Sequence, residues 1–385
     1  MNNFWNETIW KGINDEVRKV AGTVRVAQKV FPSVILDNPG NIPLDRFDVA
    51  NNTIFEGLTK PLVEISVLFR LTPNQVANEA SLQTALKLAK LRASDLARIE
   101  DLIIFQGNNA FIPPNPLQPR GINVRNQVSA GTGLLGVATD PIPGTFPPNP
   151  PIRVPLLAPP PSPPPPGVLY GQNTLAAVVR AIGVLNGNSQ PGPFALILDY
   201  RIVADVYSVL GGTLTTTADL ITPLVTGGLL GTAALPPWTG LLVSLGGEPT
   251  TIYVGVEATA AFATESDIED YRFRVFERVQ FDARDPRAFV RLDFAAPKPT
   301  ISEIDPKRGK AIGGEPITIT GQYFAPVTSV DFGGAPVNPP FEYVDDGCIK
   351  VISPRHAVGL VHIRVTTTKG NTSDMTADDQ FTYYR

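Results

Sequence analysis

Few side chains in this chain of 385 residues could act as nucleophiles or metal ligands. It has two histidines, His356 and His362, and one cysteine, Cys348. Residues 1–296 therefore lack the histidine that a Ser-His or Cys-His nucleophilic pair requires. The cysteine and the histidines do not have the spacing of a zinc site, and His362 lies in an alternating segment typical of a surface or packing residue. We expect no catalytic residue, no metal and no cofactor.

Acidic residues could instead provide general acid–base catalysis, provided that an apolar setting raises the pKa of one carboxyl. Neighbouring acids are Glu100 with Asp101, Glu265 with Asp267, and Asp282 with Asp285. We interpret each pair as part of a solvated face, a turn or a structural ion pair, and Glu100 and Asp101 as ion-pair partners on a helix. The glycine-rich residues 131–136 are followed by no Lys-Ser/Thr, so phosphate binding is not indicated either. The sequence thus argues against an enzyme.

Composition limits the class of protein. The net charge of −4 and the pI near 5.4 do not favour nucleic-acid binding, which a basic stripe would indicate. A single cysteine forms no intramolecular disulfide, and no uninterrupted apolar stretch is long enough to span a membrane. The first residues have neither a cationic nor an apolar leader segment, so we expect a cytoplasmic protein. The 39 prolines and 33 glycines imply much loop and β structure.

The elements of the chain are organised around residues 61–107. Val63, Ile65, Val67 and Phe69 alternate with polar residues, which predicts a half-buried strand. Thr72-Pro73 is a helix-start signal, and an apolar helical pattern from residue 78 continues to a stop at Gly107. A helix over 78–106 would be about 43 Å long, which is more than the diameter of a small domain. This length predicts a spine across a flat subunit.

Other segments have simpler patterns. Trp10, Ile13, Val17, Val20 and Val24 predict an amphipathic N-terminal helix, which either packs on its own core or binds a partner. Residues 31–60 predict a β-ribbon or extended loop. The proline-rich residues 140–167 predict an extended surface insertion or, alternatively, a docking ligand. Residues 173–262 begin as an α/β lobe, and strands are expected at 250–262, 271–281 and 288–294. Residues 300–385 have short β runs at the spacing of a sandwich, which predicts a second, all-β domain.

Two resemblances cover these segments. Residues 1–296 resemble an encapsulin, a shell protein of the linocin-like family with the tailed-phage major-capsid fold. The matching pieces are Trp10-Lys-Gly-Ile-Asn14, Ala27-Gln-Lys-Val-Phe31, Pro61-Leu-Val-Glu-Ile65, Ile99-Glu-Asp-Leu-Ile-Ile-Phe-Gln-Gly107, Gly133-Leu-Leu135, Gly192-Pro-Phe-Ala-Leu196 and residues 274–281. Residues 297–385 resemble an IPT/TIG immunoglobulin-like domain through Pro299, Ile301, Ile304, Pro306, Gly309, Gly313-Gly314, Ile317-Thr-Ile-Thr-Gly321, Phe324, Val330, Phe332-Gly333 and Phe381-Thr-Tyr383.

The first resemblance implies an α+β, phage major-capsid-like fold with a role for each segment. Residues 31–60 would be the E-loop, residues 61–107 the strand and spine helix of the P-domain, and residues 173–262 the A-domain. Trp10, Ile13 and Val17 on the N-terminal helix would bind cargo at the luminal surface. Thr213, Thr215, Thr216 and Thr217 would lie in a pore loop. No tryptophan occurs between Trp10 and Trp238, a departure from relatives that hold a flavin on the E-loop.

The function that follows is structural. The chain would assemble into a closed icosahedral shell, of triangulation number T=1 or larger, around a cargo protein that carries a targeting peptide. The IPT/TIG domain would decorate the exterior, and no membrane partner is expected. The alternative is a viral or prophage major capsid protein, found in a virion, that encloses DNA. A protease or bacteriocin-like enzyme is a third class, with no residue pattern in its favour.

Overall fold

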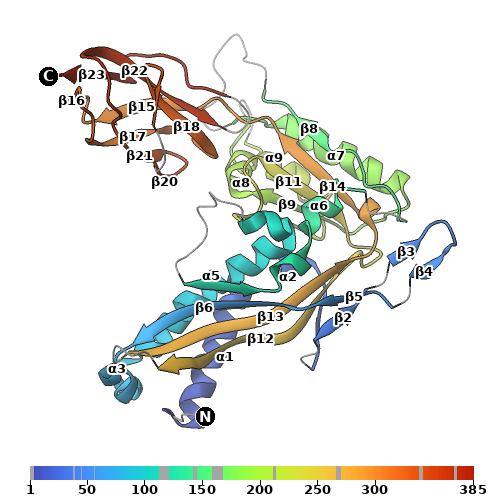
Figure 1. The fold of residues 1–385 in the computed structure, drawn as a ribbon. Coiled ribbons are helices and arrows are strands. Elements are labelled where there is room, and N and C mark those ends of the chain that lie inside the picture. Colours follow the sequence, from blue (N-terminus) through green and yellow to red (C-terminus); the bar gives the residue numbers. More distant parts are fainter. Residues whose placement is uncertain are drawn as a thin grey trace. The chain divides into compact units, whose positions relative to one another are not determined.

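The chain forms two compact units, Met1–Asp293 and Phe294–Arg385. The predicted boundary, between residues 296 and 297, lies close to this division. The structure is a computed structural model, and it describes residues 4–37, 40–44, 46–55, 57–111, 121–141, 145–157, 168–210, 214–265, 270–337, 341–367 and 371–385. Figure 1 shows the fold of each unit.

The first sheet of the N-terminal unit has five strands. Their order is β1 (Ser33–Ile35), β12 (Thr250–Glu265), β13 (Tyr271–Ala283), β6 (Val63–Leu71) and β7 (Ile122–Arg125). Helices α1 (Glu7–Val24) and α5 (Thr84–Gln106) cover one face of this sheet (Figure 1). Alternate residues of β6 and β13, such as Val67 and Val275, point into the core beneath these helices, as the period-2 pattern predicts.

The predicted long helix is interrupted. Two helices replace it, α4 (Glu79–Leu82) and α5, and a separate short helix, α3 (Pro73–Ala77), precedes them. Thr72 caps α3 as expected, but Gln83 adopts a left-handed conformation, with φ of 51°, that breaks the helical path. The Glu79 carboxylate then accepts hydrogen bonds from Ala85 N (2.7 Å) and Leu86 N (3.0 Å), which satisfies the first amides of α5. The spine helix is therefore 23 residues, or about 34 Å, rather than 43 Å.

Residues 31–61 form a ribbon of short strands after α2 (Ala27–Val30). Beyond β1, strand β2 (Asn41–Pro43) pairs antiparallel with β5 (Thr59–Pro61), and β3 (Arg46–Asp48) pairs with β4 (Thr53–Phe55). Among the described side chains of this ribbon, five large apolar ones are exposed: Val34, Ile35, Val49, Ile54 and Leu58.

The second sheet lies in the α/β lobe. Its order is β10 (Gly228–Thr232), β9 (Phe194–Asp199), β11 (Thr239–Ser244), β14 (Phe289–Phe294) and β8 (Ile152–Val154). Helices α7 (Gln172–Gly187), α8 (Tyr200–Val206) and α9 (Thr217–Ile221) belong to the same lobe (Figure 1). The short elements η2 (Gln127–Ala130), α6 (Gly133–Val137) and η3 (Pro286–Ala288) lie in connections between the two sheets, and η1 (Gly107–Phe111) follows α5.

This topology corrects two predicted segments. The range 173–262 is too long for the lobe, because β12 pairs with β13 in the first sheet and the later strand β14 joins the second. The proline-rich residues 140–167 are not simply a surface insertion, because β8 is an edge strand whose Ile152 and Val154 are buried. Proline is tolerated next to an edge strand, where one row of amides has no ladder partner. Residues 142–144 and 158–167 of this segment lie outside the described residues.

The C-terminal unit is a β-sandwich with its own core. One sheet has the order β15 (Thr300–Asp305), β17 (Pro316–Gln322), β21 (Cys348–Ile352) and β20 (Glu342–Asp345). The other has the order β16 (Arg308–Lys310), β23 (Gln380–Tyr384), β22 (Gly359–Thr367), β18 (Val327–Phe332) and β19 (Ala335–Pro336). Ile319, Phe332 and Phe381 are among the side chains fully buried between the sheets.

Candidate functional site

The largest group of perturbed ionisable residues is a buried cluster beneath the first sheet. Arg25, directly after α1, forms ion pairs through Nε with Glu100 on α5 and through Nη2 with Glu277 on β13. Both glutamates are 0 % exposed. Gln28 Nε2 also donates to Glu100 Oε1 at 2.6 Å. One guanidinium thus joins three elements that lie far apart in the sequence.

Asp101 completes this cluster by holding the turn between α1 and α2. Its carboxylate accepts hydrogen bonds from Val26 N and Ala27 N, each at 2.9 Å. These amides are the free donors at the start of α2, so Asp101 acts as a cap supplied by a distant helix. Asp101 is only 3 % exposed.

Burial is the largest influence on the pKa values of Glu277 and Asp101 in this cluster. It raises the pKa of Glu277 well above its ordinary value, with Glu100 adding to the effect and Arg25 opposing it. Burial and Glu100 also raise the pKa of Asp101 to about 7, although its backbone hydrogen bonds lower it. Burial alone would lower the pKa of Arg25, but Glu277 and Glu100 outweigh it, so the guanidinium remains charged. Glu277 and Asp101 therefore favour their protonated forms more than exposed acids do.

The cluster corrects one part of the interpretation of Glu100 and Asp101, namely that such a pair could belong to a solvated face. Glu100 is an ion-pair partner, as expected, but neither it nor Asp101 lies on a solvated face. Glu277 was missed, although β13 carried a signal: it shares the parity of Phe273, Val275 and Val279, which point into the core. A charged residue at a core position of an alternating strand requires a partner. The cluster holds α1 and α2 against α5 and the sheet.

The predicted cargo-binding residues face this same core. Ile13 and Val17 are 3 % and 0 % exposed, whereas Trp10 is half-buried. Trp10 contacts Trp5, with ring centroids 4.9 Å apart, and Trp5 stacks on Phe273 at 5.1 Å. Cargo binding by this helix stays a prediction, and of the three side chains Trp10 offers the most accessible surface.

The predicted pore-loop threonines have different environments. Thr213 lies outside the described residues. Thr216 is the N-cap of α9 and forms a capping box with Asp219, and Thr217 is fully buried. The carbonyl of Thr215 accepts a hydrogen bond from Leu210 N. The prominent exposed side chain here is Leu214, at 99 %, which the prediction omitted. A pore at this position stays a prediction.

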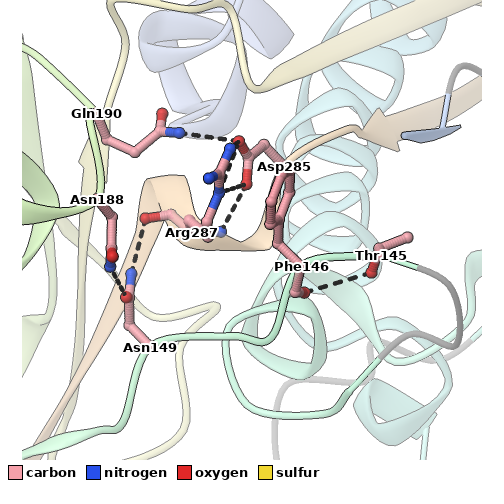
Figure 2. A network of polar contacts seen from close by, with 7 residues as sticks. All are labelled: Thr145, Phe146, Asn149, Asn188, Gln190, Asp285 and Arg287. Atoms are coloured by element: carbon pink, nitrogen blue, oxygen red, sulfur yellow. Dashed lines mark hydrogen bonds and ion pairs between the residues drawn. The ribbon is translucent and has the colours of Figure 1, made fainter. Parts of the chain in front are cut away.

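A polar network joins the proline-rich segment to the α/β lobe (Figure 2). Asn149 Nδ2 donates to the carbonyls of Arg287 and Phe289, and its Oδ1 accepts from Asn188 Nδ2 at 2.6 Å. Asp285 accepts from Gln190 Nε2 at 2.8 Å and pairs with Arg287. The Arg287 guanidinium lies 3.3 Å from the ring centroid of Phe146. These contacts fix residues 145–149 against the connection between β13 and β14.

A hollow of about 150 Å³ lies beside Phe146. The other lining residues come from the tip of the ribbon: Asp48, Val49, Asn52, Thr53 and Ile54. Asp48 is already engaged, since its carboxylate accepts from Ala50 N and Asn51 Nδ2. Among these lining residues only Asp48 is ionisable, so the hollow offers no pair of charged groups to orient a small substrate.

The described residues contain no group of three or more His, Cys, Asp or Glu side chains that could hold a metal ion. His362, one of the two histidines, pairs through Nδ1 with the buried Asp379. None of the described helices is long and apolar enough to cross a membrane.

Comparison with known proteins follows the division into two units. Residues 299–383 match the family model of the IPT/TIG domain, so this part of the prediction is confirmed. No curated protein matches the chain. The chain is similar to the crystal structure of a virus-like particle from Pyrococcus furiosus, with 13 % identity and a TM-score of 0.50, over 75 % of this chain and 100 % of that chain.

Two further structures are less similar. The capsid of a native GTA particle has 15 % identity and a TM-score of 0.47, over 72 % of this chain and 91 % of that one. The holo encapsulin complex of Synechococcus elongatus has 12 % identity and a TM-score of 0.41, over 69 % and 86 %. At such identities a likeness concerns the fold. The chain thus has the predicted mixed helix-and-sheet fold of phage major-capsid type, followed by an immunoglobulin-like IPT/TIG sandwich.

Proposed function

We propose that this chain is the subunit of a self-assembling, closed icosahedral shell that encloses a cargo protein in the cytoplasm, and that it is not an enzyme. The observation that carries the proposal is the fold likeness to a virus-like particle subunit over that subunit's full length. The encapsulin resemblance of residues 1–296 favours protein cargo over DNA.

The ribbon supports assembly independently. Its five exposed apolar side chains lie within 25 residues of one another along the chain, on short strands and their connections. Exposed apolar side chains gathered on one element mark an interaction surface, and a repeated contact is multiplied by symmetry in a closed homo-oligomer. We infer that this ribbon packs on a neighbouring subunit, as an E-loop would.

The purified protein is expected to form uniform closed particles, because the fold likeness extends over the whole of the virus-like particle chain. Negative-stain electron microscopy with light scattering measures this directly. Mass spectrometry and the absorbance ratio of the particle contents then separate a protein cargo from the alternative, a capsid that encloses DNA. A stable, soluble monomer at all concentrations would contradict the shell proposal.

Deleting residues 297–385 is expected to leave assembly largely intact, because the C-terminal sandwich has its own hydrophobic core. Particle yield and diameter of the truncated chain measure the effect. We propose that this domain is displayed on the exterior for stabilisation or attachment. A truncated chain that folds but forms no particles would instead make the domain a clasp between subunits.

A further inference from the structure

The buried cluster around Arg25 contains more acids than bases. The carboxyl groups of Glu100, Asp101 and Glu277 are each at most 3 % exposed. In the described part of the chain, Arg25 is the only cation that pairs with any of them. If all three acids were ionised, the cluster would carry three negative charges against one positive charge, out of contact with water. A buried charge without a partner is so costly that the group binds a proton instead.

The described parts of the neighbouring elements bring no second cation to the cluster. Strand β6 places the apolar Ile65 beside Glu277, and α2 contributes the neutral amide of Gln28. Charged side chains on α1, α2, α5 and β12 pair outside the cluster: Arg18 with Glu257, Glu16 with Lys90, Arg92 with Asp95, and Lys29 with the carbonyl of Thr23. Among the described residues, the charged groups that face one another here are therefore Arg25 and the three acids.

Two of the acids are close neighbours. Glu100 and Glu277 lie within hydrogen-bonding reach of each other, and each pairs with a different nitrogen of the Arg25 guanidinium. The Oε1 atom of Glu277 is buried, and no hydrogen-bond donor of the described residues reaches it. Two carboxyl groups this close repel each other when both are ionised, which favours a proton held between them. Geometry and charge thus lead to the same conclusion, that the cluster retains a proton.

The raised pKa values give this proton a direction of effect. Burial raises the pKa of Glu277 well above its ordinary value, although Arg25 opposes it, and burial raises the pKa of Asp101 to about 7. In the unfolded chain both acids ionise at about pH 4, near their ordinary values. The folded state therefore binds more protons than the unfolded state. The stability that the cluster provides is present in full below about pH 4 and is lost as the pH rises through about 7.

The turn between α1 and α2 depends most directly on this proton. Arg25 lies in the turn, and the next two residues donate their backbone N–H groups to Asp101. Full ionisation of the cluster is relieved when this turn moves away and water reaches the carboxylates. We propose that the cluster is a proton-dependent latch: it holds the turn against α5 and β13 while it retains a proton, and it releases the turn when that proton is lost. The latch belongs to the folded subunit and does not depend on the shell proposal.

Hydrogen–deuterium exchange of the full-length chain tests the latch at Val26 and Ala27, the two amides that Asp101 binds. Rates are converted to protection factors, which removes the intrinsic pH dependence of exchange, and are compared at about pH 5.5 and about pH 8.5. Wild-type protection at these amides is expected to fall about tenfold or more over this range. In Glu277→Gln the fall should be about threefold or less, because the amide stays neutral at both pH values.

Glu64→Gln is the matched control, since Glu64 is a buried acid on the other face of the same sheet. Burial raises the pKa of Glu64, but its arginine partners outweigh this effect and lower it, so this variant should keep the wild-type fall in protection. A pH effect that this control also lost would not come from the cluster, and it would overturn the latch.

Asp101→Asn provides a second variant if Glu277→Gln does not fold, because its Oδ1 can still accept hydrogen bonds from both amides. It should also reduce the fall in protection. Wild-type protection that stays constant, or a fall of equal size in these variants, would overturn the latch. An equal fall throughout β6 and β13 would overturn it as well, because the chain would then be losing its whole fold.

Discussion

Arg25→Ala is expected to lower the free energy of unfolding by about 3–5 kcal/mol, because it leaves two fully buried carboxylates without their shared cation. Lysine cannot replace this arginine, since the two ion pairs use separate nitrogens of one planar guanidinium. Chemical denaturation of the truncated chain 1–296, monitored by circular dichroism, measures the loss.

Arg18 provides the matched control. It lies on α1, the helix that Arg25 directly follows, and pairs with Asp15 and Glu257, but its side chain is 45 % exposed. Arg18→Ala should therefore cost no more than about 1 kcal/mol. Adding Glu100→Gln and Glu277→Gln to Arg25→Ala should recover part of the stability, because the uncompensated charges are then gone. Equal losses at Arg25 and Arg18 would refute the role given to the cluster.

Ala89→Pro is expected to cost about 3 kcal/mol or more and to abolish particle formation. Ala89 lies inside α5 and is fully buried, so the ring removes a helical hydrogen bond and also has no free space. Loss of α5 geometry would displace the first sheet, which packs against this helix. Thermal melting and electron microscopy measure the two effects.

Ala89→Ser is the control for this substitution, since it keeps the backbone N–H and adds a single atom. It should assemble. If Ala89→Pro formed normal particles, α5 would not be the rigid element on which the subunit depends.

The elements that the sequence predicted well are those set by local patterns. Alternation in β6 and β13, the capped start of α3 at Thr72-Pro73 and the stop at Gly107 each depend on residues within a few positions of one another. The break at Gln83 was missed, because the helical pattern continues through it and the cap comes from the side chain of Glu79. The helix was therefore predicted too long.

The polar features were harder to predict because they depend on pairing across the chain. Arg25, Glu100 and Glu277 lie far apart in the sequence, and only the docking of α1 and β13 on α5 brings them together. The net charge of −4 also does not reveal that five arginines from three strands share one face of the first sheet: Arg70, Arg125, Arg272, Arg274 and Arg278. The net charge is a sum over the whole chain, so it does not reveal how the fold distributes charged residues among different surfaces.

Cys348 would provide one site for chemical labelling on each subunit of the predicted shell. It is the single thiol of the chain, partly exposed at the start of β21, so every subunit of a particle would carry one identical attachment point. A maleimide polymer too large to cross the shell would couple to all copies if the sandwich lies outside, and to none if it lies within. The spacing of such labels would then follow the symmetry of the particle itself.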